Sequence, residues 1–186
     1  MELKMQYRQL KKKSETKRAR REGLIPAVIY KQGKVGDEVF VENAGFSAFL
    51  RGLKPGHLPT TQLELMTEDG KKRRAIIKDI QYHRTTYQVL HLDFLELEKD
   101  ALISVKVPIE FVGAAECLGV KQGGILRQVI RYLRVRCAPK HLPHSFTIDV
   151  KDIAIGQVRR LKDIAMSDDI RPLDKLNEVA VVIAKR

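Results

Sequence analysis

The chain has 186 residues, 44% of them hydrophobic and 31% charged, and this balance excludes a wholly disordered protein because it supplies enough apolar side chains for packed cores. The net charge of +12 is concentrated at the start: residues 1–34 carry eleven Lys or Arg against three Glu, a surplus of +8, whereas residues 35–97 carry eight basic against nine acidic side chains. Such a focused surplus predicts a polyanionic partner, either a nucleic acid or, as the alternative, an anionic membrane surface.

The lack of recognisable targeting signals and the cysteine pattern predict a cytoplasmic protein. The first residues lack the apolar core of a signal peptide, and no run approaches the roughly 20 apolar residues that a spanning helix needs. Cys117 and Cys137 lie outside any CxxC pattern, so we expect both to be reduced and buried.

The first elements expected along the chain are a strand and a short basic helix. Apolar and polar side chains alternate along residues 2–8, as in a half-buried strand. Ser14 then suits an N-cap, so residues 15–22 are expected to form a helix that ends at Gly23. By helical spacing its cations share one face: Lys17, Arg20 and Arg21, with Arg18 at the edge. The alternative is a solvated, partly disordered cationic arm.

The following segments predict a strand, a core helix and a meander. Residues 26–30 are apolar and are expected to form a buried strand, and residues 43–53 place their large apolar side chains on one helical stripe. Residues 60–83 contain two strand-like runs around a tight Asp69-Gly70 turn, and a third run follows at residues 87–97. We therefore expect an antiparallel sheet of three strands.

From about residue 98 the pattern is again typical of strands separated by Gly, Pro and Asp. A polar cluster at residues 96–101 divides the two strand-rich halves, which predicts one domain at residues 1–97 and a second at residues 98–186. The strands expected in the second domain lie within residues 102–113, 125–139, 144–150 and 178–184.

Catalytic and metal-binding motifs are weak. The glycine-containing segments lack the spacing of a phosphate-binding loop, and Gly123-Gly124 is expected to be a turn into a strand. His141 and His144 form an HxxH pattern, but Pro143 separates them and no carboxylate spacing completes a zinc site. We therefore expect a surface loop there and no bound metal.

His91 and Asp93 stand two residues apart on an expected strand, so they project from one face. Three interpretations stay open: a polar solvent face, an acid/base pair of an enzyme, and a recognition pair for a nucleic acid. Basic side chains would position an RNA through its phosphates, so selectivity requires other groups, for which Tyr30 and His83 are further candidates.

Several motifs resemble one known family. KRARREGLIPAVIY, IKDIQYH and LHLDF are similar, in order and spacing, to the N-terminal domain of the bacterial large-subunit ribosomal proteins that bind 5S rRNA, the general stress protein CTC family. VPIEFVGAAECLGVKQGGIL resembles the second domain of its longer members. The resemblance covers nearly the whole chain.

The resemblance implies a mainly β protein with a small N-terminal β-barrel, a few helices and a β-rich C-terminal domain. It implies a non-enzymatic component of the large ribosomal subunit that binds 5S rRNA and lies among neighbouring ribosomal proteins. It also implies no cofactor, metal, small-molecule substrate or membrane partner. The alternatives are a general RNA-binding stress factor that acts off the ribosome and an enzyme that uses His91 and Asp93 on a phosphorylated substrate.

The resemblance also implies which residues bind RNA. The basic helix and the loop before it would hold the RNA backbone, and a Tyr, a His and an Asp on barrel strands would complete the RNA face. The residues at matching positions are Arg8, Lys13, Ser14, Lys17, Arg18, Arg20 and Arg21, then Tyr30, Gln81, His83, His91 and Asp93.

Overall fold

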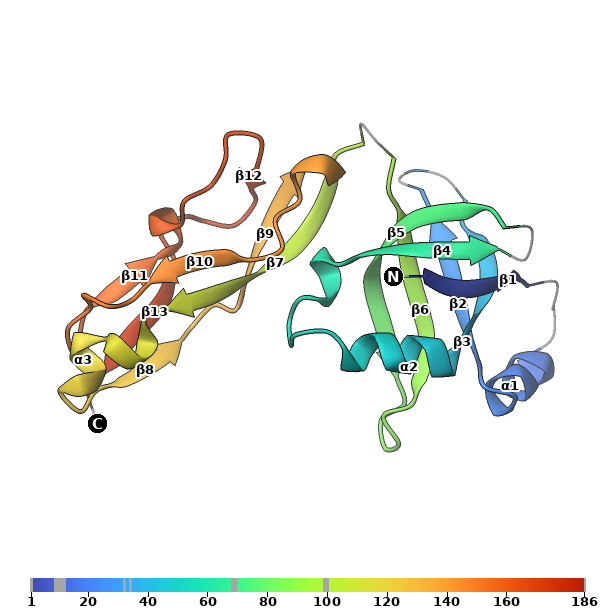
Figure 1. Cartoon of the computed structure of the whole chain (residues 1–186), viewed down its shortest axis with the longest axis horizontal. Helices are drawn as coiled ribbons and strands as arrows, with labels where there is room; N and C mark the ends of the chain where they lie inside the picture. The colour runs from blue at the N-terminus through green and yellow to red at the C-terminus, as the bar shows by residue number, and fades with distance from the viewer. Residues whose placement is uncertain are drawn as a thin grey trace. The chain divides into compact units, whose positions relative to one another are not determined.

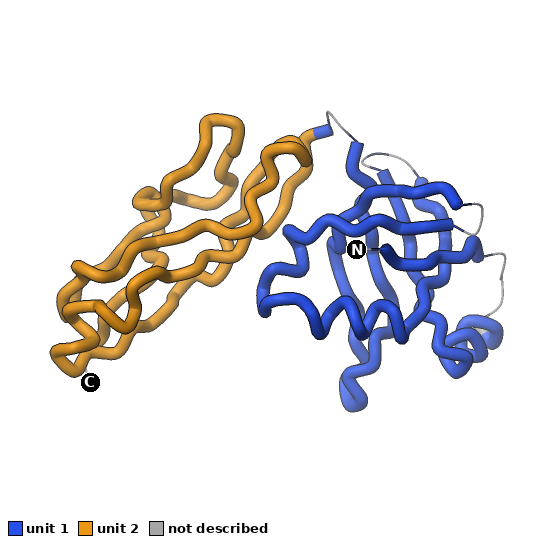
Figure 2. Tube along the Cα trace, viewed as in Figure 1, with its two compact units in different colours: residues 1–101 blue, residues 102–186 orange. Residues whose placement is uncertain are grey.

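The computed structural model describes residues 2–8, 13–31, 33, 35–67, 70–98 and 101–185. The chain forms two compact units, Met1–Ala101 and Leu102–Arg186 (Figure 2). Each unit has its own buried hydrophobic core and is built mainly from strands, so the predicted mainly β fold is confirmed. The functional domains expected at residues 1–97 and 98–186 stay a prediction.

The first unit is a closed barrel with the strand order β1-β3-β2-β6-β5-β4 (Figure 1). β4, β5 and β6 form the predicted antiparallel meander, and the barrel closes because β2 lies parallel to β6 and β1 lies parallel to β4. The strands are β1 (Glu2–Tyr7), β2 (Leu24–Tyr30), β3 (Asp37–Glu42), β4 (Gln62–Thr67), β5 (Lys72–Tyr82) and β6 (Val89–Glu96).

The barrel core follows from alternation along the strands. Leu3 and Met5 of β1 are buried while their neighbours are exposed, as the sequence predicts. The predicted core helix is α2 (Asn43–Arg51), whose Phe46 and Phe49 join the barrel core with their ring centroids 6.2 Å apart. Figure 1 shows α2 lying across one end of the barrel.

The basic helix α1 (Lys13–Arg21) confirms the predicted element and corrects its start. Ser14 lies inside the first turn and not at the cap, because the helix begins one residue before it. The predicted end of the helix at Gly23 is correct, and the amide of Gly23 donates to the carbonyl of Arg20. The backbone φ of Gly23 is 83°, a conformation that residues with a side chain rarely adopt. Asp69 of the predicted hairpin turn lies outside the described residues, and Gly70 follows it with a φ of 75°.

The second unit contains two sheets, with the strand orders β10-β7-β9-β12 and β11-β13-β8. The single strand region expected at residues 125–139 is wrong in one respect, because β8 and β9 belong to different sheets. The strands are β7 (Ile103–Val112), β8 (Ile125–Gln128), β9 (Tyr132–Cys137), β10 (Phe146–Asp149), β11 (Val158–Arg160), β12 (Arg171–Pro172) and β13 (Val179–Ala184). The helices are α3 (Leu118–Lys121) and the short 3-10 turns η1 (Leu58–Thr60, in the first unit), η2 (Ala114–Glu116), η3 (Pro139–His141) and η4 (Leu161–Asp163).

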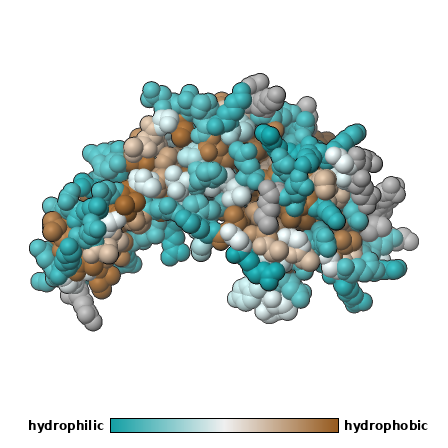
Figure 3. Space-filling model, viewed as in Figure 1, coloured by the Kyte–Doolittle hydropathy of each residue, from teal (hydrophilic) through white to brown (hydrophobic). Residues whose placement is uncertain are grey.

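Both cysteines lie in the core of the second unit. Cys117 and Cys137 are free and buried, as expected, and burial raises the pKa of the Cys137 thiol. The face of the molecule seen in Figure 3 is covered mostly by hydrophilic side chains, consistent with cores that take up the apolar ones. Of the helices in the described ranges, none is long and apolar enough to cross a membrane.

Gly124 begins a close backbone contact that supports the second unit. Its amide donates to the carbonyl of Gly119 over 2.8 Å just before β8 begins, so Gly123-Gly124 is the predicted turn into a strand. A Cβ at residue 124 would lie 2.7 Å from that same oxygen and 2.7 Å from Cγ2 of Ile183. The contact therefore leaves no room for a side chain.

Gly124→Ala is expected to destabilise the second unit by about 1–3 kcal/mol, because the backbone must move to admit the methyl group. Gly45→Ala is the matched control, since a Cβ there meets Leu3 at an ordinary 3.7 Å and alanine favours α2 by about 0.5–1 kcal/mol. Urea unfolding of both variants measures the difference. Equal stability of the Gly124 variant and the unchanged chain would rule out the close contact.

Candidate nucleic-acid interface

Helix α1 presents its cations on one solvent face. Ala19 is buried against the barrel, whereas Ser14 and the basic side chains are exposed. Arg18 donates to Glu22 over 2.8 Å, and this hydrogen bond raises the pKa of the arginine. The side chain of Lys13 lies outside the described residues. The exposed face consists of Ser14, Lys17, Arg18, Arg20 and Arg21, and we call it the helix face.

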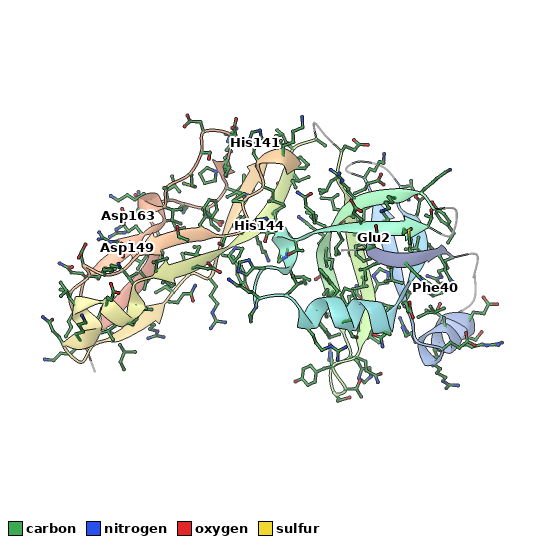
Figure 4. All side chains as sticks on the ribbon, in the orientation of Figure 1. Glu2, Phe40, His141, His144, Asp149 and Asp163 are labelled. Carbon is green, nitrogen blue, oxygen red and sulfur yellow. The ribbon has the colours of Figure 1, made fainter. Side chains whose placement is uncertain are left out.

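Arg8 differs from the exposed cations of the helix face because its side chain is mostly buried and its guanidinium contacts several groups of the protein. Its side chain is 20% exposed, against 81% for Arg18. Nη2 donates to the hydroxyl of Thr16 over 3.0 Å, and Nη1 lies 3.4 Å from a carboxylate oxygen of Glu38. The guanidinium carbon also lies 5.8 Å from the ring centroid of Phe40, which Figure 4 labels. Arg8 therefore joins α1 to the strands β1 and β3.

A second group of polar side chains lies on the outer face of β2, β5 and β6. The strand register places Asp79 opposite Asp93 and Gln81 opposite His91, while Tyr30 of β2 is opposite the residue two beyond Asp93. Partners in register project from the same face of a sheet. We call this group, Tyr30, Asp79, Gln81, His91 and Asp93, the polar face.

His91 and Asp93 form a direct pair within the polar face. His91 Nδ1 lies 2.7 Å from Asp93 Oδ1, and both side chains are partly exposed, at 23% and 32%. With the carboxylate accepting from Nδ1–H, the ring is fixed in orientation and its Nε2 is directed away from Asp93. The pair can therefore offer both an imidazole nitrogen and a carboxylate oxygen to a ligand.

Tyr30 is half-buried next to these carboxylates. Burial raises the pKa of the Tyr30 phenol, and the negative charges of Asp93 and Asp79 raise it further. A tyrosine is protonated at neutral pH already, and the raised pKa keeps the Tyr30 O–H donor to higher pH. Sequence reasoning missed Asp79, because the side-chain pattern of β5 does not reveal the bulge that brings Asp79 opposite Asp93.

The Tyr30 titration tests this arrangement. Asp93→Asn is expected to lower the pKa of Tyr30, because it removes one of the charges that disfavour the phenolate. The titration is followed by NMR of the labelled tyrosine ring carbons, with Tyr30→Phe for assignment. Glu42→Gln, an exposed change on β3, is the control and should leave the titration where it was. A Tyr30 pKa unchanged by Asp93→Asn would contradict the register.

The helix face and the polar face meet at Arg20. Its Nη2 donates to the carbonyl oxygen of Leu90 over 3.0 Å, and Leu90 directly precedes His91 on β6. Beside this contact lies a depression of about 510 Å³ that no sequence pattern predicts. Its lining includes Arg20, Arg51, Tyr82, Tyr87 and Leu90.

The structure places the predicted His83 differently from Gln81. Its amide donates to the carbonyl of Gln88, and its Nδ1 accepts from the amide of Thr86 over 3.3 Å, so the ring is part of the turn between β5 and β6. Gln81 lies on the polar face, opposite His91. The structure therefore brings Gln81 to the polar face and uses His83 in the turn.

The two histidines of the HxxH segment lie at the end of η3 and in the loop before β10. His141 Nδ1 lies 3.3 Å from a carboxylate oxygen of Asp169, and Figure 4 shows Asp149 and Asp163 further along the second unit, away from His141 and His144. Within the described ranges, no three His, Cys, Asp or Glu side chains lie close enough together to hold a metal ion.

These surfaces suit a polyanion: a row of exposed cations lies next to a group of oriented hydrogen-bonding side chains. Comparison with known proteins identifies the class. Residues 3–94 match the Ribosomal L25p family, and residues 102–186 match the family described as Ribosomal protein TL5, C-terminal domain.

Relatives align along the full length of the chain and of their own sequences. Proteins named large ribosomal subunit protein bL25 are 44% identical in Chlamydia muridarum, 45% in Chlamydia abortus and 42% in Chlamydia pneumoniae, each over 186 residues. The chain therefore belongs to the ribosomal L25p family, with a TL5-type second domain. It is a structural ribosomal protein and not an enzyme, which removes the acid/base interpretation of His91 and Asp93.

Proposed function

We propose that this chain is a component of the large ribosomal subunit and binds 5S rRNA through its first unit. Membership of the ribosomal L25p family and the names of the relatives support the large subunit. The resemblance of the barrel motifs to proteins that bind 5S rRNA supports the choice of RNA. The observation that carries the proposal is the contact of Arg20 with Leu90, because it joins the helix face to the polar face.

The helix face supplies the affinity in this proposal. Lys17, Arg20 and Arg21 are exposed and make no ion pair within the described part of the chain, so their charges are available to phosphates. Each phosphate that they neutralise releases condensed cations from the RNA, which makes binding depend on salt. Lys13, Ser14 and Arg18 extend the same contact.

Arg8 acts in this proposal mainly as a positioning residue. Its hydrogen bond to Thr16 holds α1 against the barrel, and its contacts with Glu38 and Phe40 hold the guanidinium itself in place. Its Nε is buried, so only the remaining N–H groups of Nη1 and Nη2 would reach phosphates at the base of the helix, as the resemblance implies. The helix face is then presented in a fixed orientation, which reduces the entropy lost on binding.

The polar face supplies selectivity. RNA duplexes display base edges and 2′-hydroxyls in a wide, shallow minor groove that side chains can reach. Tyr30 would donate its phenolic hydrogen there, and the Asp93 carboxylate would accept from a base amino group or a 2′-hydroxyl. His91 and Gln81 lie beside them with further donors and acceptors. The turn residue His83 would contact the backbone next to this surface.

Filter binding of the full chain to 5S rRNA at several salt concentrations tests the proposal. An RNA duplex of about 16 base pairs with unrelated sequence serves as the competitor. We expect 5S rRNA to bind more tightly than the duplex at every salt concentration. The helix face contacts the phosphates of both RNAs, whereas the polar face makes its contacts with 5S rRNA alone. Equal affinity for both RNAs would contradict the proposal and favour a general RNA-binding factor acting off the ribosome.

A further inference from the structure

The second unit carries cations on an exposed sheet face where no acidic side chain is directly opposed to them. Residues 103–108 of β7 pair with residues 132–137 of β9, and their inward side chains form the core. On the outward face, Lys106 is opposite Arg134, and Arg136 is opposite Arg171 of β12. We call Lys106, Arg134, Arg136 and Arg171 the basic sheet face.

One of these cations is neutralised within the protein. Arg134 binds Asp174, with Nη2 2.6 Å from Oδ1 and the backbone amide 2.8 Å from Oδ2. Although burial opposes it, this contact lowers the pKa of Asp174. The side chains of Lys106, Arg136 and Arg171 make no hydrogen bond or ion pair in the described residues 101–185, and all three are exposed. Glu110 lies further along β7, where it accepts from Ser145.

Stability of the sheet does not explain this arrangement. Like charges directly opposite each other on neighbouring strands destabilise a sheet, and here Arg136 is opposite Arg171 with neither charge neutralised, while Lys106 is opposite the neutralised Arg134. Charged residues often protect the edges of sheets from association, and Lys106, on a stretch of β7 that β10 does not pair, and Arg171, on β12, lie at edges. Arg134 and Arg136 lie on β9 between β7 and β12, where edge protection is not needed. The cations are therefore better explained by a ligand than by the fold.

We propose that the basic sheet face binds the phosphate backbone of duplex RNA, as a second RNA contact separate from that of the first unit. Protein partners are usually held by a buried apolar centre, whereas the outward side chains of the paired stretches include one aromatic residue, Tyr132, which is 39% exposed. Backbone contacts need cations and polar groups alone, and this face supplies both. Ser104, next to Arg136 in the register, adds a hydroxyl.

The test uses the full chain with Lys106→Gln, Arg136→Gln and Arg171→Gln combined. The control removes the same charge from exposed positions on α3, β8 and η4, with Lys121→Gln, Arg127→Gln and Lys162→Gln. Both sets are placed in a chain whose helix face is already weakened by Lys17→Gln, Arg20→Gln and Arg21→Gln. The probe is an unrelated RNA duplex of about 16 base pairs.

A plot of log affinity against log salt has a negative slope. We expect the basic-sheet-face variant to make this slope less steep by about two to three relative to the control. Its melting temperature at low salt should be equal or higher, because the opposed charges are gone. Equal slopes for the two variants would overturn the proposal. A lower melting temperature of the variant would also overturn the proposal, because it would indicate a structural role for the cations. A loss of binding to poly-glutamate without a loss of binding to RNA would overturn it as well, because it would indicate an acidic protein partner. The first unit could turn out not to prefer 5S rRNA over the unrelated duplex. The difference in slope between the two variants would still be expected, so the two proposals fail separately.

Discussion

Replacing Lys17, Arg20 and Arg21 together by Gln is expected to weaken 5S rRNA binding about 100-fold at about 0.15 M salt and to lower the salt slope by about two to three. The reason is that each cation neutralises one phosphate, and each loss removes nearly one released counterion. Alanine at Arg20 alone should lower the slope by about one. Filter binding over a range of salt concentrations measures both effects.

The matched control for this variant carries Lys121→Gln, Arg127→Gln and Lys162→Gln, which change the net charge equally but lie in the second unit. It should keep most of the affinity for 5S rRNA. If the two variants lose affinity equally, general attraction by the net charge of +12 is sufficient and the helix face has no special role.

Asp93→Ala is expected to cost about 1–3 kcal/mol of 5S rRNA binding and to reduce the preference for 5S rRNA over an unrelated duplex. The change removes the acceptor itself and also frees the imidazole of His91, whose Nδ1 lies 2.7 Å from Asp93. The salt slope should change little, because no cation is lost. Competition binding between the two RNAs measures the preference directly.

Glu42→Ala is the control for the loss of a carboxylate, since Glu42 is exposed on β3 and its side chain makes no capping hydrogen bond to α2. It should leave both affinity and preference unchanged. An Asp93 variant that loses affinity for the two RNAs in equal proportion would show that the polar face does not read the RNA.

Most of the first unit could be predicted from periodicity. Alternation in β1, the apolar stripe of α2 and the turn before β5 are signals that each segment carries in its own sequence. The sequence does not predict β3, because Val39, Phe40 and Val41 are buried consecutively and the period-two pattern is lost. β3 lies between β1 and β2 in the barrel, so the order of the strands could not be predicted from periodicity either.

In the second unit the errors have the same origin. β8 and β9 follow each other closely in sequence yet pair with β13 and β7 in different sheets. No local pattern records where a chain passes from one sheet to another, because the hydrophobic alternation continues on both sides of the connection. The helix start at Lys13 was misplaced for a smaller reason: Ser14 is compatible with a cap or with a first turn, and the sequence alone does not decide between them.

Most residues of the candidate site could be predicted from the sequence, but the contacts that bring them together could not. The shared face of the cations follows from helical spacing, and the pairing of His91 with Asp93 follows from strand spacing. The contact of Arg20 with Leu90 joins residues 70 positions apart, and the position of Asp79 depends on a bulge in β5. Arg8 shows the limit most clearly, since an alternating pattern places its side chain outward but cannot show that Thr16 and Glu38 engage it.

The central claim is that the helix face and the polar face form one RNA-binding surface. Amide chemical-shift mapping of the full chain during titration with 5S rRNA tests it most directly. The predicted result is that resonances of α1, of the end of β2 at Tyr30 and of β6 at His91 and Asp93 shift together and saturate at the same RNA concentration. Shifts confined to α1, with Tyr30, His91 and Asp93 unchanged at saturation, would contradict it.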